Sequence, residues 1–201
     1  MNSRLSELNI SGCVNLLALD CRGNDLTKLD LSDCTKLSRL NCSDNKLTAL
    51  NINSSNLTML NCVSNFITTI DVRNQTKLEE FFCNDNKISS LDLTGCTSLI
   101  ELDCRNMSSL TSLTLTNCRA LKVFYCSNSS LTSLDLSPCT ELTHLYCAGN
   151  LLQPSLDLSK CKNLQELNCI ANPSLTELVL NKEHTISPLY KDSQTQIVLV
   201  N

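Results

Sequence analysis

The sequence predicts a solenoid, a coil of short stacked repeats with one parallel β-sheet, and three observations predict it. Cysteine recurs at intervals of 20 to 22 residues over most of the 201-residue chain. Leucines keep a constant spacing around these cysteines. Only 3% of the residues are aromatic and there is no Trp, so Leu and Cys must fill the interior in place of large rings. A fixed period of this length indicates stacked structural units.

The cysteines fall into two periodic sets. The first set, which we call the first column, is Cys21, Cys42, Cys62, Cys83, Cys104, Cys126, Cys147 and Cys169. The second column stands eight residues before members of the first and is Cys13, Cys34, Cys96, Cys118, Cys139 and Cys161. We expect Ser55 and Gln75 to occupy the second column where it lacks Cys. A column that tolerates such interruptions favours a packing role.

The leucine spacing identifies the type of repeat. One unit reads Leu37-x-x-Leu40-x-Cys42-x-x-Asn45-x-Leu47, which is the leucine-rich-repeat pattern with Cys in place of the third Leu. The sequence therefore predicts a leucine-rich-repeat solenoid. We expect a curved right-handed coil with a parallel β-sheet on the concave face and extended or 3-10 return segments on the convex face. The array covers residues 1–183 as about eight rungs starting mid-repeat, and residues 184–201 form a degenerate last rung and a C-terminal β cap.

Alternation along the strand sorts the side chains of one rung. Residues 39–41 form a short strand, whose side chains point alternately to the two faces. The inward set is Leu37, Leu40, Cys42 and Leu47, and the outward set is Ser38, Arg39, Asn41 and Ser43. The turn that follows carries a recurring amide, at Asn24, Asn45, Asn65, Asn86, Asn150 and Asn172. An amide can bond unpaired backbone groups there, so the turns with Met107 and Ser129 should be held more loosely or bonded differently.

The 21-residue unit with its cysteine resembles the repeats of the internalin J-like family of bacterial surface leucine-rich-repeat proteins. The resemblance implies a curved solenoid with stacked, mainly reduced cysteines. It also implies secretion or wall anchoring of the full-length protein, and protein binding on the concave face. The chain departs from the family pattern because it has no N-terminal helical cap, Ig-like neighbour or sorting signal, and because it has the second cysteine column.

The cysteines and the acidic residues allow several interpretations. Disulfides, a soft-metal site and inert packing are all conceivable for the cysteines, and we favour packing because buried Cys behaves as a small hydrophobe. Asp recurs in the return segments at Asp30, Asp71, Asp92, Asp135 and Asp157. A calcium ladder would need accompanying calcium loops, which the sequence lacks. We therefore expect these carboxylates to be solvated or to bond locally to the next turn.

The concave strands hold the candidate binding site. The outward position just before the first column reads Asp20, Asn41, Asn61, Phe82, Asp103, Tyr125, Tyr146 and Asn168, so three of the seven aromatic residues share one line. The predicted partner-binding patch is Phe82, Asp103, Val123, Tyr125, His144 and Tyr146. Exposed aromatics with a polar rim are typical of protein-binding hot spots, although cross-strand packing alone could also place them there. Phe81 and Phe124 belong to the inward row and to the core.

Composition and motifs limit the function classes. A net charge of −4 and the absence of a basic stripe argue against nucleic-acid binding. No apolar run approaches the roughly 18 residues of a membrane span, and the N-terminus has no signal peptide. No catalytic constellation can be assembled around His144 or His184, so we expect no enzymatic activity, no cofactor and no metal. The chain is predicted to bind a protein ligand as a recognition or adhesion module of a secreted or surface protein. The alternative is the recognition arm of a larger enzyme or effector. An uncapped first rung also suggests end-to-end self-association.

Overall fold

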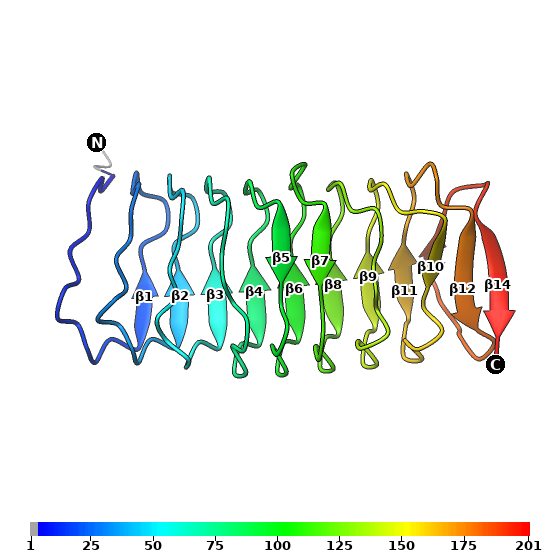
Figure 1. The fold of residues 1–201 in the computed structure, drawn as a ribbon, viewed down its shortest axis with the longest axis horizontal. Helices are drawn as coiled ribbons and strands as arrows, with labels where there is room; N and C mark the ends of the chain where they lie inside the picture. The colour runs from blue at the N-terminus through cyan, green and yellow to red at the C-terminus, as the bar shows by residue number, and fades with distance from the viewer. Residues whose placement is uncertain (1–3) are drawn as a thin grey trace.

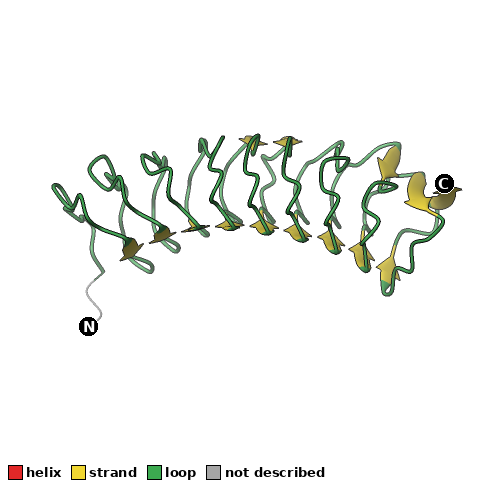
Figure 2. Cartoon of the chain, turned by 90° about the horizontal axis from the view of Figure 1, so that it is seen from below, coloured by secondary structure: helices red, strands yellow, loops and turns green. Residues whose placement is uncertain are grey.

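The computed structural model describes residues 4–201 and shows a curved stack of coils (Figures 1 and 2). The leucine-rich-repeat solenoid is confirmed, with one strand more in its main sheet than the eight expected rungs. That nine-stranded parallel sheet lines the concave face. Its strands, in spatial order, are β1 (Ala18–Asp20), β2 (Arg39–Asn41), β3 (Met59–Asn61), β4 (Glu80–Phe82), β6 (Glu101–Asp103), β8 (Val123–Tyr125), β9 (His144–Tyr146), β11 (Glu166–Asn168) and β13 (Leu189–Tyr190).

The convex face is only partly ordered into strands. One two-stranded sheet pairs β5 (Ser90–Asp92) with β7 (Ser112–Thr114). A three-stranded sheet runs β10 (Ser155–Asp157), β12 (Glu177–Asn181) and β14 (Gln196–Val200). Before β5, the return segments from residue 4 onward are extended but form no convex strand. No 3-10 helix occurs within residues 4–201, so the returns are extended only.

Stacked Leu and Cys side chains form the core. The inward residues Leu37, Leu40, Cys42 and Leu47 are at most 1% exposed, and Phe81 and Phe124 are fully buried, as the alternation predicts. One coil cannot bury its own apolar face, so this core exists only because each coil covers the next. The expected outward position of Ser43 is wrong, because this side chain is buried.

The asparagine column ties neighbouring coils together at one edge. The Nδ2 group of Asn45 donates to the carbonyls of Cys21, Cys42 and Ser43 at 3.0–3.1 Å. Its Oδ1 accepts the amide of Leu26 at 3.1 Å. One buried amide thus satisfies backbone groups on two coils, which would otherwise lie buried without partners.

The interruption of this column has the predicted effect. Ser129 Oγ donates to the Cys104 carbonyl and accepts from the Met107 amide, both at 3.4 Å. These two bonds are longer than any that Asn45 makes. Met107 itself is fully buried, so apolar packing takes the place of the missing amide in that coil.

Of the two expectations for the convex returns, one is confirmed and one is wrong. The carboxylates bond locally, as predicted: Asp30 Oδ1 accepts the Ser32 amide at 2.9 Å, and the same bond recurs at Asp71, Asp92, Asp135 and Asp157. The expectation for Ser55 is wrong, because Ser54 is the buried residue of the second column and Ser55 is exposed. The interval from Cys42 to Cys62 is 20 residues, so the frame moves by one position there.

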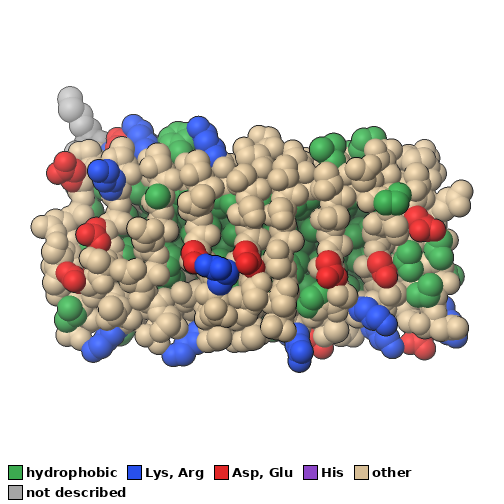
Figure 3. Space-filling view, in the orientation of Figure 1, with side chains coloured by type: hydrophobic (Ala, Val, Ile, Leu, Met, Phe, Trp, Pro, Cys, Tyr) green, Lys and Arg blue, Asp and Glu red, His purple; other side chains and the backbone are tan. Residues whose placement is uncertain are grey.

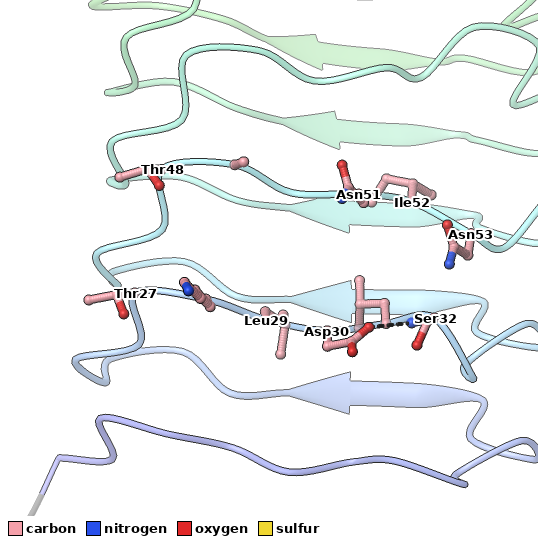
Figure 4. A pocket seen from close by; sticks show the side chains of 11 residues that line it. Thr27, Leu29, Asp30, Ser32, Thr48, Asn51, Ile52 and Asn53 are labelled. Carbon is pink, nitrogen blue, oxygen red and sulfur yellow. Dashed lines mark hydrogen bonds between the residues drawn. The ribbon is translucent and has the colours of Figure 1, made fainter.

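Spaces open between the coils on the convex face where the returns do not pair. A groove of about 710 Å³ lies between residues 27–32 and 48–53 (Figure 4). Leu29 and Leu31 line it from one coil, and Ile52 lines it from the next. Figure 3 shows the convex face, where hydrophobic side chains are visible between the coils. Neighbouring coils are joined strand to strand on the concave face, whereas their convex returns are further apart. The stack therefore curves.

Candidate functional site: the concave aromatic row

The strand register places one outward residue of every coil on a single line along the concave sheet. We call this line the concave row. It consists of Asp20, Asn41, Asn61, Phe82, Asp103, Tyr125, Tyr146, Asn168 and Tyr190. Neighbouring strands lie about 4.8 Å apart, so members of the row on adjacent coils can touch. The row therefore runs the length of the sheet as one surface.

The structure brings most of the predicted patch together. Tyr125 and Tyr146 are in register on β8 and β9. Val123 and His144 are in register on the same two strands, two residues earlier. All four side chains are partly exposed, as is Phe82 on β4. Phe82 is separated from Tyr125 by the coil that carries Asp103.

The two tyrosines form the most ordered feature of the patch. Their ring centroids are 4.8 Å apart and the ring planes differ by 7°. This stacking matches the strand spacing, so the backbone holds the rings in place. Burial is the main reason that the pKa of Tyr146 rises to about 12, and the neighbouring Glu166 carboxylate raises it further. The Tyr146 phenol is therefore neutral at physiological pH.

The prediction of Asp103 as an exposed binding residue needs correction. Asp103 is only 6% exposed. Arg105 covers it through two hydrogen bonds, from Nε to Oδ1 at 3.0 Å and from a terminal nitrogen to Oδ2 at 2.7 Å. The same guanidinium lies 4.9 Å from the centre of the Tyr125 ring. Asp103 thus orients Arg105, and the arginine forms the surface.

Sequence reasoning missed three members of this surface. Arg105 stands two residues after Asp103 and shares its outward face, so the alternation could have revealed it. Tyr190 follows Leu189 as Tyr146 follows Leu145, but it lies in the degenerate last rung, where the frame is hard to see. Glu166 is in register with His144 on the neighbouring strand.

The surface around the row is acidic. Glu80 and Glu101 are in register on β4 and β6, and burial, followed by the charges of Glu80 and Asp103, raises the pKa of Glu101. Within the described residues, none of Glu80, Glu101 and Glu166 forms an ion pair, whereas Arg105 is paired with Asp103. The free charge near the aromatic residues is therefore negative.

The other candidate chemistries find little support in residues 4–201. His144 Nδ1 lies 2.9 Å from Thr143 Oγ1, and Cys147 is fully buried on the opposite face of its strand. No three His, Cys, Asp or Glu side chains of this part of the chain meet as metal ligands. All fourteen cysteines are free thiols, and all except Cys13 are buried. Residues 4–201 contain no helix that is long and apolar enough to cross a membrane.

Solved structures similar to this chain share its repeat architecture. The functional domain of InlJ from Listeria monocytogenes, which includes a cysteine ladder, is 32% identical with a TM-score of 0.75, and the match covers 88% of this chain and 42% of that one. A leucine-rich-repeat protein of Leptospira interrogans is 20% identical with a TM-score of 0.53, over 92% of this chain and 55% of that one. YopM from Yersinia enterocolitica is 19% identical with a TM-score of 0.53, over 98% and 53%.

Each of these matches covers only part of the similar structure. The chain spans about half of the length of these structures or less. No protein-family model matches it, and no curated protein matches it in sequence. The resemblance to internalin J-like repeats is confirmed, because InlJ has the highest sequence identity and the highest TM-score of these three structures. This chain is a leucine-rich-repeat solenoid with a cysteine ladder, and its repeats are similar to those of InlJ.

Proposed function

We propose that this chain is a protein-recognition module, rather than a catalyst, and that its concave sheet binds the partner around Phe82, Val123, Tyr125, His144 and Tyr146. Arg105 takes the place of Asp103 on the binding surface. The observation that carries the proposal is the stacked pair Tyr125–Tyr146, held partly exposed on a continuous parallel sheet.

The chemistry of the pair suits recognition. Tyr and Arg are the residues most often found at the energetic centre of protein interfaces. Because the rings are already stacked and Arg105 is fixed by Asp103, these side chains lose little conformational freedom when a partner binds. A surface that is ordered before binding loses less conformational entropy, so it binds more tightly than flexible side chains of the same area.

The resemblance to internalin J-like proteins supports a secreted or cell-surface location and an adhesive role for the full-length protein.

The proposal also concerns the two ends of the stack. We propose that residues 184–201 cap the array of residues 1–183. The first coil exposes Leu5, Val14 and Leu17, which supports end-to-end association; sedimentation equilibrium would detect it as a mass that rises with concentration.

A capture experiment tests the binding surface. The wild-type chain, the double variant Tyr125→Ala/Tyr146→Ala and the control Phe66→Ala are immobilised and exposed to surface proteins of candidate host cells. Phe66 is an exposed aromatic residue, 45% accessible, outside the concave row. We expect a partner that the wild type and the control retain and that binds the double variant at least about ten-fold more weakly. Equal retention by all three chains would overturn the assignment of the site.

A further inference from the structure

The concave row contains two gaps between aromatic residues. In the first gap, Asp103 stands between Phe82 and Tyr125 on successive strands. In the second gap, Asn168 stands between Tyr146 and Tyr190. In each case one short polar side chain separates two rings that lie two strands apart, or about 9.6 Å at the usual strand spacing. The two gaps are therefore equivalent positions of the same repeat.

The chain fills the first gap itself. The Arg105 guanidinium forms two hydrogen bonds with Asp103 and lies 4.9 Å from the centre of the Tyr125 ring. This separation is close to the 4.8 Å between the rings of Tyr125 and Tyr146. A cation thus lies over the Tyr125 ring at a distance similar to that of the next ring in the row. Cation–π attraction and the carboxylate both favour it there.

The second gap lacks such a group. Ile170 occupies the position equivalent to Arg105, two residues after Asn168, and it is 40% exposed. Asn168 Oδ1 accepts only the Ile170 amide, at 3.4 Å. Tyr190 is 51% exposed, and no ring stacking or cation–π contact to it occurs within the described residues. Tyr190 therefore has neither a ring nor a cation from residues 4–201 on its faces, in contrast to Tyr125 in the first gap.

The charge beside the second gap is negative. Glu166 belongs to the same coil as Asn168 and points to the same face, two residues earlier. Its carboxylate lies near the Tyr146 hydroxyl, where it contributes to the raised pKa of that phenol. It has no cationic partner in residues 4–201. His144 is in register with Glu166, and Lys191, next to Tyr190, directs its ammonium group to the carbonyls of Asp192 and Thr195.

We propose that the second gap binds an arginine side chain of a basic protein segment, with the guanidinium stacked between Tyr146 and Tyr190 and paired with Glu166. This inference rests on the proposed function, because it names the chemistry that the concave surface recognises. The gap would give the guest what the first gap gives Arg105: an aromatic face and a carboxylate. A lysine would gain the charge interaction but not the planar stacking. A neutral planar side chain would gain the stacking without the charge.

A set of three peptides tests this selectivity. The probes are capped Gly-Arg repeats of eight residues, the same peptide with lysine, and the same peptide with citrulline, which is planar and neutral. Binding to the full chain is followed by calorimetry or by NMR at low salt. We expect the arginine peptide to bind about two- to five-fold more tightly than the lysine peptide, and the citrulline peptide to bind least. Equal binding of arginine and lysine peptides would overturn the proposal.

Substitutions at the gap locate the bound arginine. Asn168→Tyr would complete the row of rings, and Ile170→Arg would supply an internal arginine as in the first gap; each should abolish the preference for arginine. Tyr190→Ala should do the same, whereas Tyr190→Phe, which keeps the ring, should preserve it. Phe66→Ala is the control, since Phe66 carries Lys87 on its ring at 4.9 Å but lies outside the row. If Asn168→Tyr and Tyr190→Ala bind the peptides as the wild type does, the second gap is not the site.

The outcomes separate this inference from the proposed function. If Tyr125→Ala/Tyr146→Ala loses a captured partner while the peptides show no preference for arginine, recognition on the concave sheet stands and the arginine site falls. If the peptides behave as expected while the double variant, which lacks one ring of the second gap, retains every captured protein, the gap binds arginine peptides but the captured proteins use neither the gap nor the wider patch. Circular dichroism of each variant establishes that the solenoid is folded before binding is compared.

Discussion

The two cysteine columns look alike in the sequence but differ in what surrounds their thiols. In the first column, Cys83 and Cys104 are fully buried, and no thiol of this column donates a hydrogen bond within residues 4–201. In the second column, Cys96 Sγ donates to the Val72 carbonyl of the preceding coil at 3.1 Å, and Cys118 Sγ to the Leu93 carbonyl at 3.3 Å. The first column packs against apolar side chains, and the second faces backbone acceptors.

The residues that replace cysteine in the second column follow this difference. Ser54 Oγ donates to the carbonyls of Thr35 and Leu37 at 3.0 and 2.7 Å. Beyond the last cysteine of the column, His184 accepts the Asn181 amide at Nδ1, so its Nε2 carries a proton and donates to the Cys161 carbonyl at 2.8 Å. Gln75 is the exception, because its buried Oε1 has no hydrogen-bond partner. The first column therefore accommodates a small apolar side chain, whereas several positions of the second column, at Cys96, Cys118, Cys161 and Ser54, hold a small donor.

The largest expected effect comes from the burial that both columns share. Burial raises the pKa of the thiols, for example to about 12 for Cys62 in the first column and for Cys118 in the second. In the unfolded chain the thiols ionise near the ordinary value of 9.0. Above that pH the folded state holds protons that the unfolded state has lost, so stability falls as pH rises through the interval between the two values.

Each buried thiol should then cost about 1 kcal/mol for each pH unit above 9, and thirteen cysteines are buried. Because a domain is stable by roughly 5–15 kcal/mol, we expect the solenoid to unfold between about pH 9 and pH 11. Circular dichroism during a pH titration under reducing conditions measures this transition. A urea midpoint that is the same at pH 8 and pH 11 would contradict the burial of the columns.

A smaller effect separates the two columns directly. Cys83→Ser buries a hydroxyl without an acceptor and should lower the free energy of unfolding by about 2 kcal/mol. Cys96→Ser places the hydroxyl beside the Val72 carbonyl and should cost less than about 1 kcal/mol. Urea unfolding of the two variants gives both values, with Cys13→Ser as an exposed control. Equal losses at the two positions would remove the distinction between the columns.

A third effect, below that of Cys83→Ser, concerns Ser54, the serine that stands in the second column in place of cysteine. Ser54→Ala removes the side-chain donor of the buried Leu37 carbonyl and the shorter of the two side-chain donors of the Thr35 carbonyl, and it should lower the free energy of unfolding by about 1–2 kcal/mol. Ser54→Cys restores a weak donor of similar shape, so its melting temperature should lie between those of the alanine variant and the wild type. If the cysteine variant is less stable than the alanine variant, a donor is not what this position requires.

The repeat period made the fold predictable, while the details of the site depended on contacts between coils. The inward residues, the asparagine turns and the outward line of Phe82, Tyr125 and Tyr146 all follow from a frame of about 21 residues. The displacement from Ser55 to Ser54 arose because one interval is a residue shorter. The burial of Asp103 does not follow from its outward position, because it depends on the Arg105 side chain, which folds back over the carboxylate.

Other parts of the site could not be read from a pattern. The 7° angle between the tyrosine rings and the position of the Arg105 guanidinium depend on side-chain torsions and on neighbouring strands. Tyr190 could be assigned to the row only once β13 was seen to pair with β11, since Pro188 and Lys191 stand where the repeat has other residues.

The convex sheet of β10, β12 and β14 has a consequence for the mechanics of the opposite face. These strands belong to the coils that carry β9, β11 and β13, so the spacing of those coils is set by hydrogen bonds on both faces. Bending there would break ladder bonds on one face or the other. Residues 27–32 and 48–53, by contrast, share no hydrogen bond with each other, so the groove between these two returns can widen or narrow. We therefore expect the solenoid to bend more easily in its N-terminal half than in its C-terminal half. In the C-terminal half, pairing on both faces keeps the coils that carry Tyr146 and Tyr190 at a constant separation.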